Sequence, residues 1–297
     1  MKKGWYAIIL FQIALVIFVV SLINTGSTNI SSLRIVSAEN FWGSLASQIG
    51  GDKVQVSNVV SDPNADPHEF ESSSKNSRDI SSARLVIFNG LGYDSWANKL
   101  IDANPSSNRD VLNVGDFLNL KTGDNPHVWY SIKYSKMVSN QIYNKLSQID
   151  PENSSYYLNN LNNLNKSLNY LSSLEYSISN YYASTDVACT ESVFYYMAQE
   201  MKLNLISPAS FMRSVSEGNE PPSRSVATFI DQINLKQPAI LIYNQQTETP
   251  ITQSMKSLAI KNGIKTLGIT ETMPNKMNYV QWMNNQINQI YKDLRNE

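Results

Sequence analysis

The sequence contains one cysteine, Cys189, and two histidines among its 297 residues. A single cysteine excludes a disulfide within the chain, because that bond joins two thiols.

Lysine and arginine total 24 against 25 aspartates and glutamates, and no cluster of basic residues occurs. This balance argues against a nucleic-acid-binding protein. Charged residues make up only 16% of the chain, below the typical quarter or so. Asn, Ser and Tyr supply the polar surface instead, which favours a location outside the cytoplasm.

The N-terminus predicts export. Lys2 and Lys3 precede an apolar run from Trp5 to Ile23, and a polar spacer follows at 24–29. Basic residues before an apolar stretch hold the N-terminus in the cytoplasm and send the rest outward. The run approaches the roughly 20 residues that span a bilayer. We therefore expect residues 1–30 to be an uncleaved signal anchor with its spacer, with a cleaved signal peptide as the alternative. A lipid-anchored bacterial binding protein needs a cysteine just after such a run, and none stands there. A protein held at the membrane must therefore be held by the apolar segment itself.

Residues 31–149 predict a first α/β lobe. Short apolar strands alternate with segments whose apolar residues recur at helical spacing, which is typical of βαβ units and a mostly parallel sheet. The expected strands are 33–37, 54–60, 83–88 and 110–114, and the expected helices are 40–49, 94–101 and 134–149.

Residues 150–183 predict one long, rigid linking helix. Asp150 can cap it, with Pro151 at its first position and Glu152 in its first turn. No Gly or Pro interrupts the pattern up to Tyr182. Apolar residues recur every three or four positions, at Leu161, Leu164, Leu168, Leu171, Leu174 and Ile178. We interpret this stripe as a face that packs on the chain's own lobes and expect a monomer; a coiled-coil dimer is the alternative.

Residues 184–297 predict a second α/β lobe. The expected strands are 185–189, 205–207, 239–243 and 266–269, and the expected helices are 193–203, 223–235, 252–262 and 279–294. The predicted fold class is therefore α/β, with two lobes of mostly parallel sheets joined by one long rigid helix. Ligands of such sheets bind beyond the carboxyl ends of the strands, which here places a site in the cleft between the lobes.

Four polar residues follow predicted strands and suggest a metal site. Both histidines stand directly after proline, His68 in the first lobe and His127 further along it. Proline fixes its own φ and extends the residue before it, so each imidazole leaves a stiff segment. Glu191 and Glu271 follow strands of the second lobe. Two imidazoles and two carboxylates make a complete ligand set for a divalent cation.

Each of these residues also has a simpler interpretation. Either histidine could be a surface or hydrogen-bonded residue. Glu191 could be a favourable acid at a helix N-terminus, and Glu271 an ordinary loop acid. Cys189 fits a small core residue better than a fifth ligand. The acids beside His68 are better interpreted as its neighbours, although one of them could replace Glu271; they are Asp66, Glu69 and Glu71.

The chain resembles the zinc/manganese-type solute-binding proteins of ABC metal importers. The resemblance covers nearly everything after residue 33. It rests on the segments 64–71 (NADPHEFE), 125–129 (NPHVW), 190–196 (TESVFYY), 269–272 (ITET) and 279–283 (YVQWM). It implies a rigid two-lobed receptor that captures Mn²⁺ or Zn²⁺ and passes the ion to an ABC permease in the membrane.

The resemblance also implies the ligands. Its first two match His68 and His127. The third is His in many zinc members and Glu in manganese-type members, and Glu191 stands there. The fourth is usually Asp, where this chain has Glu271. The stretch 117–124 also lacks the His-rich loop of many zinc members. Oxygen ligands suit Mn²⁺ better than a three-histidine site does, so manganese is slightly favoured and zinc stays open.

Two other functions compete with the receptor. A metal-dependent hydrolase needs an open coordination position and a general base. The sequence has no HExxH helix, no Gly-x-Ser-x-Gly elbow and no Gly-rich phosphate loop, so we expect neither an enzyme nor an organic cofactor. A metal-binding surface adhesin or receptor on the same fold is the second alternative, and the sequence does not separate it from the first interpretation.

Overall fold

The computed structural model describes residues 32–62, 70 and 73–295. The expected N-terminal anchor and His68 lie outside these residues. Within them, no helix combines the length and apolarity needed to cross a membrane. The described residues from 33 onward form one compact unit.

The first lobe is built on a sheet of four parallel strands in the order β2-β1-β3-β4. The strands are β1 (Leu33–Glu39), β2 (Val54–Val60), β3 (Leu85–Phe88) and β4 (Asp110–Asn113). β1 and β3 form the middle of the sheet. All four residues of β3 are buried, as expected of a central parallel strand covered on both faces.

Five α-helices accompany this sheet among the described residues: α2 (Asn40–Gly50), α3 (Ser74–Ser82), α4 (Ser95–Ala103), α5 (Val114–Phe117) and α6 (Ile132–Ile149). The sequence analysis missed α3. Only Asn76 and Ile80 of that helix are buried, so it has almost no apolar face to detect. Its signal is a capping box, in which Ser73 and Asn76 each bond the other's backbone N–H.

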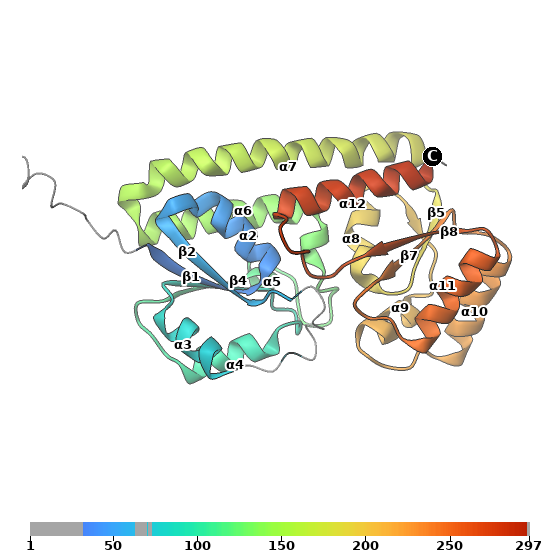
Figure 1. Cartoon of the computed structure of the whole chain (residues 1–297), viewed down its shortest axis with the longest axis horizontal. Helices are drawn as coiled ribbons and strands as arrows, with labels where there is room; N and C mark the ends of the chain where they lie inside the picture. Colours follow the sequence, from blue (N-terminus) through green and yellow to red (C-terminus); the bar gives the residue numbers. More distant parts are fainter. Residues whose placement is uncertain (1–31, 63–69, 71–72, 296–297) are drawn as a thin grey trace, which may run out of the picture. The chain divides into compact units, whose positions relative to one another are not determined.

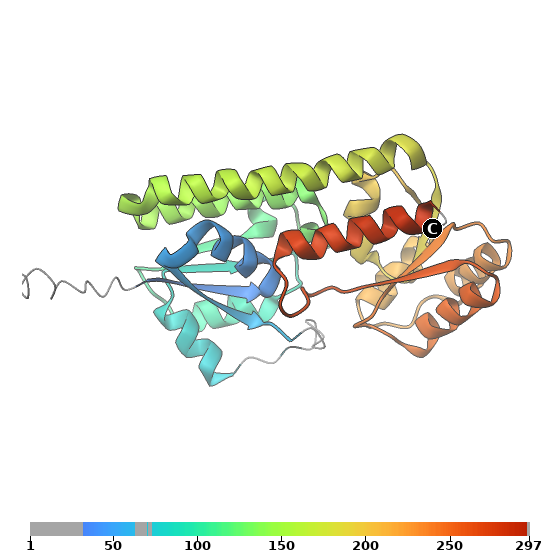
Figure 2. The same ribbon diagram turned by 45° about the horizontal axis from the view of Figure 1, so that its top comes forward.

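The long helix α7 (Ser154–Tyr182) has 29 residues. Pro151 lies in a preceding 3₁₀ turn, η4 (Pro151–Asn153), so the α-helix begins later than its predicted cap at Asp150. α7 packs against α2 and α6 of the first lobe and against α8 (Tyr195–Glu200) and α12 (Tyr279–Leu294) of the second (Figures 1 and 2). Five of the six stripe residues are buried within the chain: Leu161, Leu164, Leu168, Leu171 and Ile178.

The second lobe repeats the architecture with the strand order β6-β5-β7-β8, all parallel. The strands are β5 (Asp186–Cys189), β6 (Asn204–Leu205), β7 (Ile240–Asn244) and β8 (Lys265–Ile269). Its other helices are α9 (Ala209–Ser216), α10 (Ser223–Asn234) and α11 (Pro250–Lys261). The predicted helix 193–203 is divided into a 3₁₀ turn, η5 (Ser192–Phe194), and α8, and α9 was not predicted.

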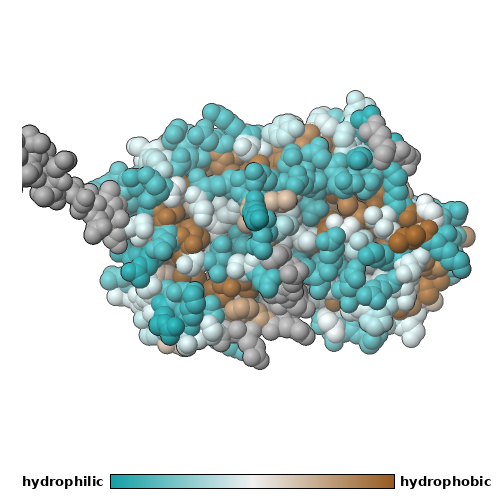
Figure 3. Space-filling model, viewed as in Figure 1, coloured by the Kyte–Doolittle hydropathy of each residue, from teal (hydrophilic) through white to brown (hydrophobic). Residues whose placement is uncertain are grey.

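One apolar core serves both lobes. It joins Trp42 and Trp129 of the first lobe to Cys189 and Trp282 of the second, and the leucine stripe of α7 belongs to it. The Phe41 ring stacks on Trp129 with centroids 4.1 Å apart. The face drawn in Figure 3 is mostly hydrophilic, with scattered apolar patches. The predicted fold class is confirmed: two four-stranded parallel sheets with helices, and one long helix that contacts both lobes.

Candidate metal centre

Three of the four predicted ligands converge on one buried point. One potential ligand atom from each of His127, Glu191 and Glu271 lies within 4.8 Å of the others. All three side chains are at most 1% exposed. His68, the fourth, lies outside the described residues, as do the alternative acids Asp66, Glu69 and Glu71.

Loops at the carboxyl ends of the strands supply these side chains. Glu191 follows β5, and Glu271 follows β8, two strands that flank β7 in the sheet. His127 precedes the 3₁₀ turn η3 (Val128–Tyr130), in the connection between β4 and α6. Pro126 restricts this connection, and its carbonyl accepts a hydrogen bond from the Val128 N–H at 2.7 Å. The backbone of Glu191 is extended, with φ −150° and ψ −177°.

Hydrogen bonds fix the orientation of the His127 ring. The Asn125 side-chain oxygen accepts from the His127 backbone N–H at 3.0 Å and lies 2.8 Å from Nδ1. The Asn125 nitrogen donates to the Ser192 carbonyl at 2.8 Å, which identifies the oxygen as the atom facing the ring. Nδ1 therefore carries hydrogen and Nε2 faces the interior. Trp129 packs edge-on against the ring, with centroids 5.2 Å apart.

Nε2 of His127 lies 3.2 Å from Glu271 Oε1. With the proton on Nδ1, the Nε2 lone pair and the carboxylate oxygen are two acceptors that face each other. A positive charge between or beside these two acceptors offsets their mutual repulsion. The geometry therefore suits a positively charged ligand.

The last residue of β7 and the residues just after it hold both acids. The Asn244 nitrogen donates to Glu191 Oε1 at 2.7 Å and to Glu271 Oε2 at 2.9 Å. Thr247 donates to Glu191 Oε2 at 2.6 Å, and the Gln246 oxygen accepts from the Glu271 backbone N–H at 2.5 Å. The sequence analysis missed these residues. Their signal was the polar run 244–247 directly after the apolar strand 239–243, the same rule that found the acids.

The electrostatics of the site favour a cation. Two carboxylates about 5 Å apart repel by roughly 3 kcal/mol at an effective dielectric constant near 20. Burial and the nearby charges of Glu271 and Glu39 hold the pKa of Tyr93 well above its usual value, so its phenol stays neutral.

Burial also raises the pKa of the Cys189 thiol to about 12. A protonated, fully buried thiol is a core residue, and Cys189 is not part of the cluster of potential ligands.

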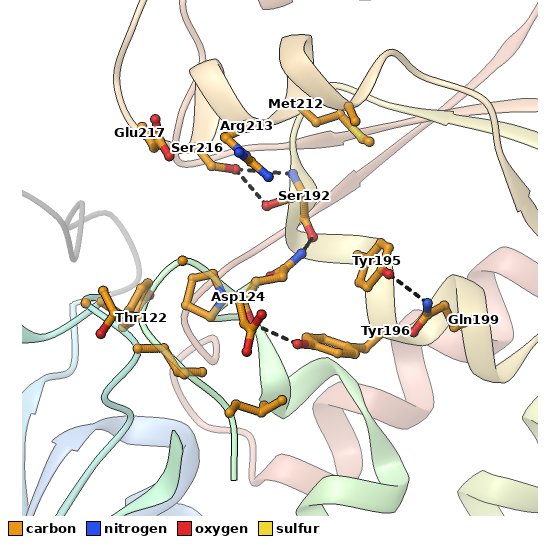
Figure 4. A pocket seen from close by; sticks show the side chains of 18 of the residues that line it. Thr122, Asp124, Ser192, Tyr195, Tyr196, Gln199, Met212, Arg213, Ser216 and Glu217 are labelled. Atoms are coloured by element: carbon orange, nitrogen blue, oxygen red, sulfur yellow. Dashed lines mark hydrogen bonds between the residues drawn. The ribbon is translucent and has the colours of Figure 1, made fainter. Parts of the chain in front are cut away.

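A cavity of about 680 Å³ adjoins this cluster. The loop before His127 lines one side of it, and η5, α8 and α9 line the other. Asn125 and Ser192, which both contact the His127 ring nitrogen Nδ1, are among its lining residues. Ser192 is held from the second lobe by hydrogen bonds to the Ser216 hydroxyl (Figure 4). The cavity thus ends at the residues that orient His127.

Comparisons with known proteins show which family the chain resembles along most of its length. The family described as "Zinc-uptake complex component A periplasmic" matches residues 35–293. The manganese ABC transporter substrate-binding lipoprotein PsaA of Streptococcus pneumoniae is 22% identical over 267 residues, covering 84% of this chain and 85% of PsaA.

Two solved structures share the fold. FpvC of Pseudomonas aeruginosa, a solute-binding protein in complex with Mn²⁺, superposes with a TM-score of 0.74 at 21% identity over 89% of this chain and 99% of its own. The periplasmic zinc-binding protein TroA of Treponema pallidum superposes with a TM-score of 0.75 at 14% identity. The match covers 89% of this chain and 99% of TroA.

Proposed function

Because the chain belongs to the family of periplasmic component A proteins of zinc-uptake complexes, we propose that it captures Mn²⁺ or Zn²⁺ outside the cytoplasm and delivers the ion to an ABC importer. The buried cluster of His127, Glu191 and Glu271 is the observation that carries this proposal. His68, from the other Pro-His segment, is the fourth ligand that the family resemblance adds.

The ion is cargo rather than a catalyst. Four protein ligands fill a tetrahedral site and leave no position for a reacting water. The family consists of uptake components, and its relatives are substrate-binding proteins of transporters, so the chain is a binding protein and not an enzyme. Two carboxylates neutralise the ion's double charge, which offsets the cost of burying it.

The donor set leaves two metals in competition. Two carboxylates beside imidazole favour Mn²⁺ more than a three-histidine site would, whereas N/O sites in general bind Zn²⁺ more tightly. Relatives and structural neighbours include a manganese transporter component and a zinc-binding protein. We propose Mn²⁺ as the preferred cargo, with Zn²⁺ as the competitor.

Elemental analysis of the purified chain tests the function. We expect a single divalent ion per chain that survives gel filtration and is lost on treatment with a chelator. Reloading with Mn²⁺ or Zn²⁺ should raise the melting temperature, because the ion binds the folded state alone. A chain that retains no divalent metal and gains no stability from either ion would contradict the proposed function.

The partner is an ABC permease in the membrane, and the chain acts as a monomer. The apolar stripe of α7 supports the second point, since five of its six residues are buried within the same chain. An adhesin on this fold would also bind metal, but it would not restore metal uptake to cells that lack their own binding protein.

The N-terminal segment 5–23 anchors the protein at the outer face of the membrane. The relatives named above include a lipoprotein, but the only cysteine here is Cys189, which is fully buried. The apolar run is the remaining means of attachment. Cell fractionation should find the full chain with the membrane and a chain that starts at residue 31 in the soluble fraction. A released chain that has lost its N-terminal segment would instead indicate a cleaved signal peptide.

A further inference from the structure

Two side chains that are not themselves ligands hold the acids of the candidate metal centre. Asn244 ends β7 and is 1% exposed, and β7 lies between the two strands that lead to Glu191 and Glu271. Thr247 follows three residues later and donates to Glu191 Oε2 at 2.6 Å. We name Asn244 and Thr247 the carboxylate clamp.

The orientation of the Asn244 amide is fixed independently of the acids. Its oxygen accepts the Gln246 backbone N–H at 3.0 Å, so its nitrogen must face the carboxylates. A side-chain amide has two N–H donors. One serves Glu191 Oε1 at 2.7 Å and the other Glu271 Oε2 at 2.9 Å. A single group therefore joins two acids that would otherwise repel each other.

The clamp leaves the acids able to bind an ion. Glu271 is held at Oε2, while its Oε1 faces His127 Nε2 at 3.2 Å. Glu191 is held at both oxygens, and a carboxylate oxygen has two lone-pair sites, so it can accept more than one partner. The Asn244 and Thr247 donors thus fix where the carboxylates lie.

We propose that the carboxylate clamp consists of positioning residues that set the separation of Glu191 and Glu271 before the ion arrives. This inference rests on the proposed function. Without the Asn244 amide, charge repulsion turns one acid away from the other, and the ion must bring both back at the expense of its affinity. Outer partners of metal ligands commonly contribute 10- to 100-fold to affinity.

Three variants of the full chain test the clamp. Asn244→Ala removes the bridge, and Thr247→Val removes one donor to Glu191 at nearly constant volume. Gln245→Ala is the matched control, because Gln245 lies in the same segment, is exposed and makes no hydrogen bond to His127, Glu191 or Glu271. The measurements are Mn²⁺ and Zn²⁺ affinity by chelator competition, the visible absorption of the Co²⁺-loaded protein, and the melting temperature without metal.

We expect Asn244→Ala to weaken binding by about 10- to 100-fold and to change the Co²⁺ spectrum, which reports ligand geometry. Thr247→Val should weaken binding several-fold, and Gln245→Ala should match the wild type in every measurement. A residue with a merely structural role would lower the melting temperature and leave the Co²⁺ spectrum as it is.

The outcomes separate the clamp from the function. A wild-type chain that binds metal together with an Asn244→Ala variant of equal affinity and equal Co²⁺ spectrum overturns the clamp alone. A wild-type chain that binds no divalent metal overturns the proposed function. If Asn244→Ala does not fold, Thr247→Val decides: weaker binding supports the clamp, and wild-type affinity overturns it.

Discussion

Replacing Glu191 by glutamine is expected to weaken Mn²⁺ and Zn²⁺ binding by at least about 100-fold, since a direct ligand should contribute no less than the residues that support it. Glutamine keeps the volume and one acceptor oxygen but removes the charge that neutralises the ion. The same loss is expected for His127→Ala and for His68→Ala. Chelator competition measures it directly.

The metal-free protein should respond to Glu191→Gln in the opposite direction. Removing one of two neighbouring buried carboxylates relieves their repulsion, so the melting temperature without metal should rise while the rise induced by metal disappears. Glu217→Gln is the matched control, because Glu217 is an exposed acid that lines the cavity and lies outside the ligand cluster. Wild-type affinity in the Glu191, His127 and His68 variants alike would show that the ion binds elsewhere.

The second large effect concerns a buried acid of α7. Glu175 is 3% exposed, and burial followed by the neighbouring Glu200 raises its pKa from 4.5 to about 10. The Glu200 carboxylate accepts from the Ser131 hydroxyl and from the Ile132 N–H at 3.1 Å, at the N-terminus of α6. Because its own pKa is raised so far, Glu175 holds a proton at neutral pH.

Glu175→Gln is expected to stabilise the protein, and the gain should grow with pH. The folded chain keeps the Glu175 proton while the unfolded chain releases it above about pH 4.5, so wild-type stability falls as pH rises from there toward 10. Glutamine mimics the neutral acid and has no proton to release. The gain in unfolding free energy should be about 3 kcal/mol at pH 7 and larger at pH 9.

Urea unfolding at about pH 5, 7 and 9 measures this difference. Glu152→Gln is the control, because Glu152 is exposed beside the start of α7 and should change nothing at any of these values. A Glu175→Gln variant that is less stable than the wild type at every pH would mean that the native protein requires the ionised form.

The predictable part of the fold had strong local signals. The strands of both sheets are short apolar runs, and the uninterrupted stripe at helical spacing marked α7. The short helices α3 and α9 were missed. For α3 the reason is physical: two buried residues do not generate a detectable apolar face. A cap such as Ser73 with Asn76 shows where a helix starts, but it does not show that the helix packs against anything.

The candidate site was found by one rule, that polar residues just past parallel strands gather at one edge. The rule named His127, Glu191 and Glu271, which the structure brings together; their role as ligands stays a prediction. The same rule could have named Asn244. It did not, because Gln245 and Gln246 follow the same strand, and the sequence does not show which of these side chains points between the acids.

The sequence by itself determined the alternation of strands and helices, the long helix and the residue types of the site, because each depends on local spacing and on residues near one another in the chain. The tertiary structure alone decided that β7 lies between β5 and β8, which places the Asn244 amide between two acids from different loops. It also decided that Glu175 is buried against Glu200. Both follow from the order in which distant segments pack, and neither the separation of two charges nor their access to water can be derived from the spacing of residues along the chain.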